Sequence, residues 1–339
     1  MGLRIRVVLA AALALLPTSA PWTPAIHGQP TAARAMAPAS GHGGPMPLAR
    51  RSGGRAASEH CPVVTRFTSC DIGRANMFVF AALIPIGRAD YQFTIGWHTE
   101  VNKLEYRAVV RVKVLGVKGR AADGLTATIT AECGGSCTST GQVSGPLSTV
   151  GQEWGGTLNF RDAVAADKMH ASQAVFKIRP WHPSRGFGTP SRITAGSTVR
   201  CDDTFATHAG CVIQEVFPVL TSMAGLAGIS ANIARVQAAT KLGVPNSVAT
   251  ALHRMKDKAL REKNRDIVCH PGVTGPRPKG QSCDEYPFAS TYEGGVPVRA
   301  GTPMWAWVPA EEQSKQGGRL ATFYTANRVL DNDGFYVQV

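Results

Sequence analysis

Short β-rich runs dominate the chain from about residue 60 to residue 211. Apolar and β-branched residues gather at 77–84, 91–97, 104–117 and 125–131, and turn-forming residues separate these runs. Residues 106–114 partly alternate between apolar and polar side chains, which is typical of a half-buried strand. Several strands without helical periods between them predict an antiparallel sandwich or a barrel-like fold. We therefore assign residues 61–211 to an all-β domain.

Helical spacing replaces this pattern after Cys211. Apolar residues recur at intervals of three and four at Leu220, Met223, Leu226, Ile229, Ile233 and Val236. This spacing predicts a helix with one buried face. A second helix is predicted from Asn246, a suitable N-cap, to about residue 265.

The last part of the chain returns to alternation. Residues 304–308 predict a strand, Gly317 and Gly318 predict a turn, residues 324–328 predict a short helix, and residues 335–339 predict a final strand. Residues 212–339 are therefore expected to form an α+β domain large enough to fold alone.

The N-terminus has the pattern of an export signal. Arg4 and Arg6 precede an apolar run at 7–16, which stops at Pro17 before small residues, so residues 1–20 are predicted to be a signal peptide. Residues 21–60 contain almost no bulky apolar side chains and are expected to be a disordered linker or propeptide. The apolar stretch 216–239 contains polar residues, so we expect no membrane span after signal cleavage and a secreted, extracellular protein.

The chain contains eight cysteines, which an exported protein is expected to oxidise. The alternative role for these cysteines is a zinc site, but the sequence contains no two closely spaced Cys-x2-Cys elements. Sequence alone leaves many connectivities open. Chain order suggests four local pairs: Cys61 with Cys70, Cys133 with Cys137, Cys201 with Cys211, and Cys269 with Cys283.

The formal net charge of +13 indicates attraction to polyanions. A basic surface favours phosphate backbones, but it serves equally for adhesion to anionic cell-wall polymers or lipid surfaces. The net charge therefore indicates the class of partner but does not indicate the reaction.

Three acids lie within ten residues in this basic chain: Asp284, Glu285 and Glu293. Clustered carboxylates could hold a divalent cation and activate water for phosphodiester hydrolysis. The structural alternative is that they cap a helix or pair with nearby lysines and arginines. In an extended segment Asp284 and Glu285 would point to opposite faces, so both reach one ion only where the chain turns.

The segment at 283–295 reads Cys-Asp-Glu-Tyr-Pro-Phe-Ala-Ser-Thr-Tyr-Glu-Gly-Gly, and it closely resembles the signature of the NucA/NucB-type secreted bacterial deoxyribonucleases. Further matches flank it in order, and the resemblance covers about residues 215–339. They are Asn264-Arg265, Cys269, Val308-Pro309-Ala310, Gln316-Gly317-Gly318, Phe323-Tyr324, Asn327-Arg328-Val329-Leu330 and Phe335-Tyr336-Val337.

The resemblance implies an endonuclease that cuts DNA with little sequence preference and uses a divalent cation, Mg²⁺ or Mn²⁺. It places Asp284, Glu285 and Glu293 at the centre of the site. We expect Asp284 to be the leading metal ligand, Glu293 a second ligand or general base, and Arg265 a clamp on the phosphate. The expected DNA-binding residues are Arg254, Lys258, Arg261, Asn264, Gln313 and Arg328.

Two positions depart from the family pattern. Asn232 stands where relatives often have histidine, and Gln313 where they often have asparagine. The departures support a different class of function, a cell-envelope or polyanion-binding protein whose nuclease unit is degenerate. A third reading keeps the nuclease as a toxin, which an immunity or inhibitor protein would accompany.

Overall fold

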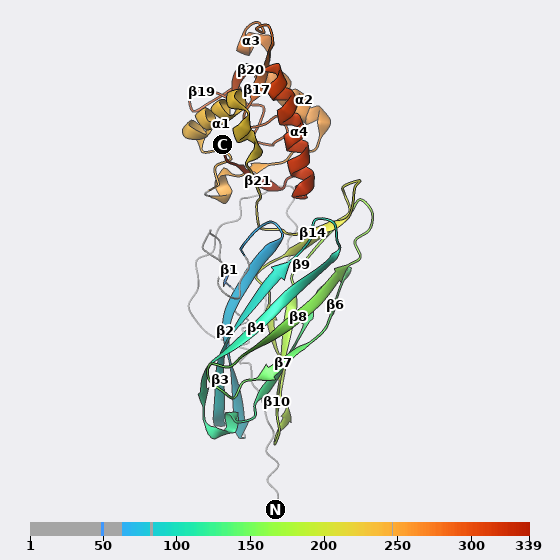
Figure 1. Ribbon diagram of the computed structural model, residues 1–339, viewed down its shortest axis with the longest axis vertical. Helices are drawn as coiled ribbons and strands as arrows, with labels where there is room; N and C mark the ends of the chain where they lie inside the picture. The colour runs from blue at the N-terminus through green and yellow to red at the C-terminus, as the bar shows by residue number, and fades with distance from the viewer. Residues whose placement is uncertain (1–48, 51–62, 82–83, 246) are drawn as a thin grey trace, which may run out of the picture.

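The computed structural model describes residues 49–50, 63–81, 84–245 and 247–339. The predicted signal peptide, most of the predicted linker and Cys61 lie outside these residues. The described part contains two units that lie end to end (Figure 1). We call the described residues between 49 and 213 the β unit, and those between 219 and 339 the C-terminal unit.

One sheet of the β unit is six-stranded and runs in the order β1-β2-β3-β4-β8-β6. Its strands are β1 (Ala49–Arg50), β2 (Thr68–Ala81), β3 (Ile84–His98), β4 (Glu105–Lys118), β8 (Glu153–Asp162) and β6 (Cys137–Thr140). All of its neighbouring strands are antiparallel. Ala49–Arg50, which lie in the predicted linker, pair with Ile72 and Asp71 at the edge of β2.

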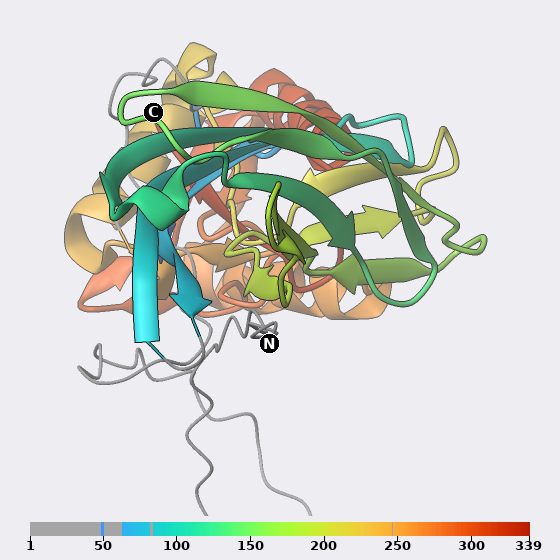
Figure 2. The ribbon, with the colours of Figure 1, turned by 90° about the horizontal axis from the view of Figure 1, so that it is seen from below.

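A second antiparallel sheet runs in the order β11-β10-β5-β7, and β12 also pairs with β10. Its strands are β5 (Thr126–Glu132), β7 (Val143–Pro146), β10 (Val175–His182), β11 (Gly186–Phe187) and β12 (Ser191–Thr194). A third sheet joins β9 (Met169–Ser172), β13 (Val199–Asp202) and β14 (Gly210–Ile213). Viewed along the long axis, the strands lie in layers (Figure 2).

Alternation along the strands builds one hydrophobic core in the β unit. In β4 the residues Tyr106, Ala108, Val110, Val112 and Val114 are buried, and the residues between them face outward. Buried residues of the other strands join this core, so the N-terminal part is largely β, as predicted. The predicted strand at 77–84 is wrong at its end, because β2 stops at Ala81 and β3 starts at Ile84.

The C-terminal unit contains helices and strands, as predicted, around a separate core. Its helices are α1 (Ala227–Thr240), α2 (Lys258–Val268), α3 (Pro271–Thr274) and α4 (Ala310–Ala326), and short 3₁₀ turns occupy Ser222–Gly225 and Val248–Thr250. The strands β15 (Val219–Leu220), β21 (Gly334–Val337) and β16 (Leu252–His253) form one sheet. The strands β17 (Gln281–Glu285) and β20 (Trp305–Pro309) form another, and β18 (Val298–Arg299) pairs with β19 (Thr302–Pro303).

One predicted helix and one predicted turn differ from the structure. The helix predicted from Asn246 begins only at Lys258, because Leu252 is buried in β16 against β21 and the Asp257 side chain caps the helix at Leu260 N. The turn predicted at Gly317-Gly318 is instead part of α4. Both glycines lie on its exposed face, while Gln316, Leu320, Phe323 and Tyr324 are buried on the other. This burial outweighs a glycine penalty of about 1 kcal/mol per residue.

Three of the four predicted disulfides are confirmed: Cys133–Cys137, Cys201–Cys211 and Cys269–Cys283. The fourth pair includes Cys61, which lies outside the described residues. Within the residues that the structure describes, no helix has both the length and the apolar character needed to cross a membrane.

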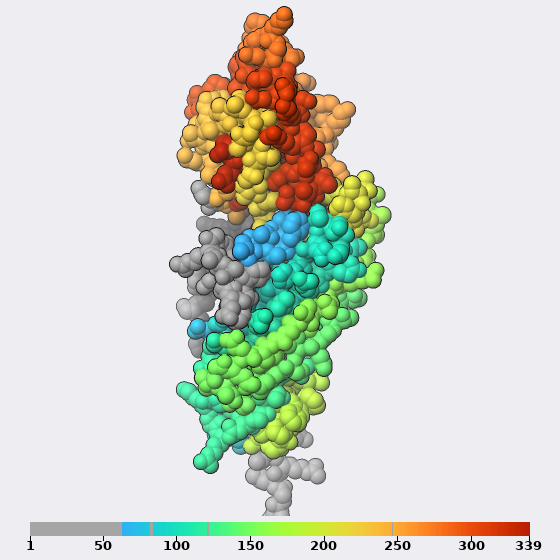
Figure 3. Space-filling view, in the orientation of Figure 1, coloured from blue at the N-terminus to red at the C-terminus, as the bar shows by residue number. Residues whose placement is uncertain are grey.

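The two units meet end to end (Figure 3). A buried ionic network joins them. Arg328, after α4, donates to both carboxylate oxygens of Asp202 in β13, at 2.9 and 2.5 Å. Asp333 accepts from Arg66 at 2.8 Å and from Arg200 at 2.5 Å. Arg328, Arg200 and Arg66 are all buried, so these ion pairs are shielded from solvent. The network fixes the C-terminal unit on the end of the β unit.

Candidate active site

The central acids sit on strand β17, whose antiparallel partner is β20. Asp284 lies opposite Ala306 and Glu285 opposite Trp305. The Cys269–Cys283 disulfide ties the start of this acidic pair to the end of α2. Strand pairing on one side and the disulfide on the other hold both carboxylates in fixed positions between the helices.

Asp284 is fully buried between α1 and α4. Its carboxylate accepts a hydrogen bond from Asn232 Nδ2 at 2.9 Å and from Gln316 Nε2 at 2.7 Å. The Gln313 amide suits its neighbours when its nitrogen faces Asp284 Oδ1 at 3.2 Å and its oxygen faces Arg265 at 3.2 Å. We call Asn232, Gln313 and Gln316 the amide cradle.

Burial raises the pKa of Asp284 to about 7, although the hydrogen bonds from Asn232 and Gln316 oppose the shift. The nearby charge of Glu285 raises the pKa further. This carboxyl group thus lacks a counter-charge of its own, which is unusual for a structural surface acid and typical of a functional site.

Glu285 is also buried, and its carboxylate accepts from Arg265 Nη1 at 3.2 and 3.3 Å. Arg265 donates in addition to the carbonyl oxygen of Cys283 at 3.2 Å. Burial raises the pKa of Glu285, and the Arg265 guanidinium partly opposes that shift. Arg265 is therefore the ion-pair partner of Glu285, and its charge also lowers the pKa of the neighbouring Asp284.

A cavity of about 300 Å³ opens beside Glu285. Helix α2 contributes Lys258, Arg261 and Arg265 to its wall, and α4 contributes Gln313 and Gln316. Three basic side chains thus line a cavity that also contains the acids Glu262 and Glu285 and two amides. Such a combination suits a negatively charged substrate whose reacting group needs further charge neutralisation.

The part of the chain that contains most of these elements matches a known protein family. Residues 237–338 match the family Deoxyribonuclease NucA/NucB. We call them the NucA/NucB region. Comparison with curated proteins and with solved structures gives no match. The β unit lies outside the NucA/NucB region, as does Asn232 of the amide cradle.

Within the NucA/NucB region the third predicted acid, Glu293, lies in a different setting. Its carboxylate accepts from His253 N and from His253 Nδ1, each at 2.8 Å. Glu293 lines a separate cavity of about 310 Å³ together with His253 and Asp333, whereas Glu285 lines the cavity beside α2. Asp284 and Glu293 were predicted to be joint metal ligands. The structure does not bring these two side chains together.

The hydrogen bond to Glu293 raises the pKa of His253, and partial burial opposes this rise. Because the folded-state pKa lies above the unfolded value of about 6.5, the pair stabilises the fold fully below that pH. The contribution disappears as the pH rises through the raised pKa. We expect Glu293→Gln to lower the thermal midpoint more at pH 5.5 than at pH 8.5.

Differential scanning calorimetry of wild type and Glu293→Gln at both pH values measures this difference. Glu311→Gln is the matched control, because Glu311 is exposed on α4 and pairs with Lys315. Its effect should be nearly the same at both pH values. An equal loss for Glu293→Gln at pH 5.5 and pH 8.5 would rule out the charged His253–Glu293 pair.

The predicted DNA-binding residues divide into two groups. Lys258, Arg261 and Gln313 line the cavity beside Glu285, where a substrate could reach them. The other three, Arg254, Asn264 and Arg328, are engaged in the fold. Arg254 donates to Val329 O and lies 4.5 Å from the Tyr324 ring centre, and Asn264 donates to Ala289 O and Thr291 O.

Arg328 is the clearest correction, because it is fully buried against Asp202 and cannot contact DNA. Its partner Asp202 lies 126 residues away in the sequence, so no local pattern indicates this pairing.

Gln316 is a site residue that the sequence analysis did not single out. It belongs to the matched Gln-Gly-Gly segment, and it follows Gln313 by three residues, so both face the same side of α4. That spacing is the signal that could have identified it. Asn232, which departs from the family pattern, donates to Asp284 and so forms part of the site.

Proposed function

We propose that the protein is a secreted, metal-dependent endonuclease that hydrolyses DNA with little sequence specificity. The observation that carries this proposal is the buried Asp284–Glu285 pair, which lies beside a basic cavity within the NucA/NucB region. The disulfides of the described residues support an oxidising, extracellular setting.

The residues around Asp284 fit a divalent cation. Asp284 supplies carboxylate oxygens, which are the ligand type that Mg²⁺ and Mn²⁺ prefer, and Glu285, the next residue of strand β17, lines the neighbouring cavity. The amides of Gln313 and Gln316 face Asp284 with their nitrogens, so they hold the carboxylate and are not assigned as ligands. Arg265 pairs with Glu285, and Asp284 has no ion-pair partner within the described residues. Cys269 and Cys283 also lie near Glu285, but their sulfurs are joined in a disulfide and offer no thiolate. Bound here, such an ion would neutralise charge on the scissile phosphate.

The side chains of the cavity account for the remaining requirements. We assign Arg265 to hold a non-bridging phosphate oxygen, because its guanidinium is half exposed toward the cavity and already fixed by Glu285. Of the two buried acids, Glu285 is the one that lines the cavity, and we assign it to accept the proton of the attacking water. Glu293 then has a positioning role through His253.

Low sequence specificity follows from the kind of contact available. Lys258 and Arg261 are cations suited to phosphates, and phosphate contacts position a duplex without reading its bases. Cleavage of several unrelated plasmids by the full chain, with mapped cut sites, tests this point. Cuts spread over many sequences support it, and cuts confined to one motif, or cleavage of RNA alone, would contradict it.

The alternative of a degenerate nuclease unit rested on Asn232 and Gln313. Both positions provide amides that contact Asp284, so the departures preserve a polar cradle around the acid. This observation favours the enzyme over the degenerate unit. Whether the enzyme acts as a toxin depends on an inhibitor protein, which co-purification with the expressed chain would detect.

Mg²⁺ or Mn²⁺ is expected to raise the thermal midpoint of the wild-type chain by a few degrees. This is about the shift that a ligand gives when its concentration is 100 times the Kd of its site. Asp284→Asn should abolish this rise, because the variant loses the charge of the leading ligand. Glu293→Gln is the matched control and should keep it, because Glu293 is bound to His253 instead. A full rise in Asp284→Asn would place the ion elsewhere.

A further inference from the structure

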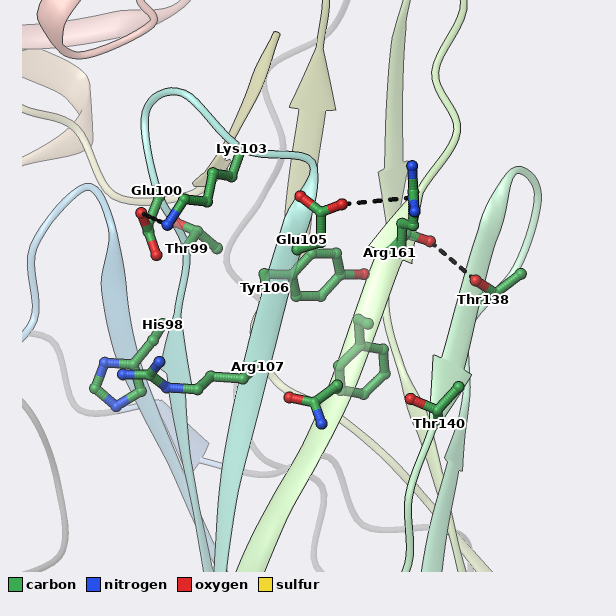
Figure 4. Close-up of a pocket in the computed structure, with 12 residues that line it drawn as sticks. His98, Thr99, Glu100, Lys103, Glu105, Tyr106, Arg107, Thr138, Thr140 and Arg161 are labelled. Carbon is green, nitrogen blue, oxygen red and sulfur yellow. Dashed lines mark hydrogen bonds and ion pairs between the residues drawn. The ribbon is translucent and has the colours of Figure 1, made fainter.

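A cavity of about 600 Å³ lies on the outer face of the six-stranded sheet, outside the NucA/NucB region. Its walls come from the end of β3, the loop that follows it, and the neighbouring strands β4, β8 and β6 (Figure 4). We call it the β-face cleft. None of its lining residues belongs to the site around Asp284.

Strand register aligns four polar residues across the cleft. His98 lies opposite Arg107, Arg107 opposite Asn159, and Asn159 opposite Thr140. Since neighbouring strands are about 4.8 Å apart, the row extends over roughly 14 Å. Within the described residues none of these four side chains makes a hydrogen bond or an ion pair, so all four are available to a ligand.

Arg107 is the cation that a ligand would meet in the cleft. The two carboxylates of the wall are already paired, Glu100 with Lys103 at 2.7 Å and Glu105 with Arg161 at 3.5 Å. Partial burial and the charge of Arg107 both lower the pKa of His98, so His98 is neutral at neutral pH and can donate or accept a hydrogen bond.

The cleft offers no aromatic platform. Its two rings, Tyr106 and Phe160, are buried in the core and stack on each other with centres 5.1 Å apart. Recognition of single-stranded bases relies on exposed rings on which bases stack, and stacking is thus excluded as the binding mode here. A free arginine beside amide, hydroxyl and imidazole groups suits a chain of phosphates and sugar oxygens.

Arg111 extends the basic track beyond the cleft. It follows Arg107 by four residues on the same exposed face of β4, which corresponds to roughly 13 Å along a strand. Within the described residues Arg111 likewise has no carboxylate partner. Two free arginines along one strand can contact an extended polyanion at two separate points.

The loop between β3 and β4 connects the cleft to the nuclease unit. Arg328 Nη1 donates to the carbonyl oxygen of Val101 in this loop at 2.8 Å, and Arg328 belongs to the NucA/NucB region. The strands of the cleft and helix α4 appear on the same face of the molecule (Figure 3). A long polyanion bound in the cleft can therefore continue toward the C-terminal unit.

We propose that the β-face cleft is an auxiliary binding site for the phosphate backbone of double-stranded DNA. Arg107 pairs with a phosphate, while Asn159 and Thr140 donate to neighbouring phosphate or sugar oxygens. The choice of DNA among phosphate polymers rests on the proposed nuclease function. The cleft holds substrate near the C-terminal unit and adds affinity without adding sequence preference.

Fluorescence anisotropy with the full chain and a labelled 40-base-pair duplex tests the proposal. The experiment uses an Asp284→Asn background with EDTA, so that the duplex stays intact. Arg107→Gln should weaken binding roughly three- to tenfold at 0.1 M salt and reduce the salt dependence by about one phosphate contact. Arg120→Gln is the matched control, since Arg120 is an exposed arginine at the far end of β4.

Equal affinities and equal salt dependence for Arg107→Gln and Arg120→Gln would overturn the proposal. Binding of a polyol-phosphate polymer through Arg107, without binding of DNA, would also overturn it. If the wild type fails to cut DNA but binds the duplex through Arg107, the auxiliary site stands and the nuclease proposal fails. Unchanged melting of Arg107→Gln shows that the fold is intact, because Arg107 is exposed.

Discussion

Arg328→Met is expected to lower the free energy of unfolding by about 3–5 kcal/mol, the cost of leaving one partner of a buried ion pair alone. Arg328 is fully buried and holds both carboxylate oxygens of Asp202. It also donates to the carbonyl oxygens of Val101 and His208, at 2.8 and 3.0 Å. The substitution would leave the Asp202 carboxylate buried, with hydrogen bonds from Thr204 and with its ion-pair partner Arg200 3.7 Å away.

Urea unfolding followed by tryptophan fluorescence measures this loss. Arg192→Met is the matched control, because Arg192 pairs with Glu132 on the exposed surface and should cost less than about 1 kcal/mol. A loss of less than 1 kcal/mol for Arg328→Met would show that the network between the units contributes little. A DNA-binding role of Arg328 would instead change affinity and leave stability unaltered.

Asp284→Asn is expected to reduce the rate of DNA cleavage by at least about a hundredfold, because a metal ligand that neutralises the transition state contributes several kcal/mol. The variant should remain folded. Burial raises the pKa of Asp284 to about 7, so the fold already tolerates an uncharged group in the amide cradle. Asparagine has nearly the same shape as the protonated acid.

Glu311→Gln serves as the control for this loss, since it removes one acid from the exposed face of α4. Its cleavage rate should stay within about twofold of wild type. Initial rates of plasmid relaxation at saturating Mg²⁺ give the comparison, and circular dichroism verifies the fold. A rate of Asp284→Asn close to that of Glu311→Gln would remove Asp284 from the catalytic centre.

Local sequence patterns predicted the features that depend on residues close together in the chain. Alternation along residues 106–114 identified β4, because each inward residue is buried in the core. Short spacings between cysteines identified the three disulfides, which join residues only 4, 10 and 14 positions apart. The ordered motif around Asp284 identified the family of the C-terminal region.

Features that depend on distant partners could not be predicted in this way. Arg328 looks like any basic surface residue until Asp202 is brought against it by the fold. Glu293 lies near Asp284 in sequence, yet the turn after Phe288 directs it to His253. Apolar residues at 252 and 255 fit a helical period, but pairing of β16 with β21 takes precedence over helix propensity there.

The most direct test of the proposed function is nicking of supercoiled plasmid by the purified full chain, with the divalent ion first removed by EDTA and then restored. We expect no nicking in EDTA, and nicking that returns with added Mg²⁺ or Mn²⁺ and yields cuts at many positions. Intact plasmid under every divalent ion, or equal cutting in EDTA, would contradict a metal-dependent deoxyribonuclease centred on Asp284 and Glu285.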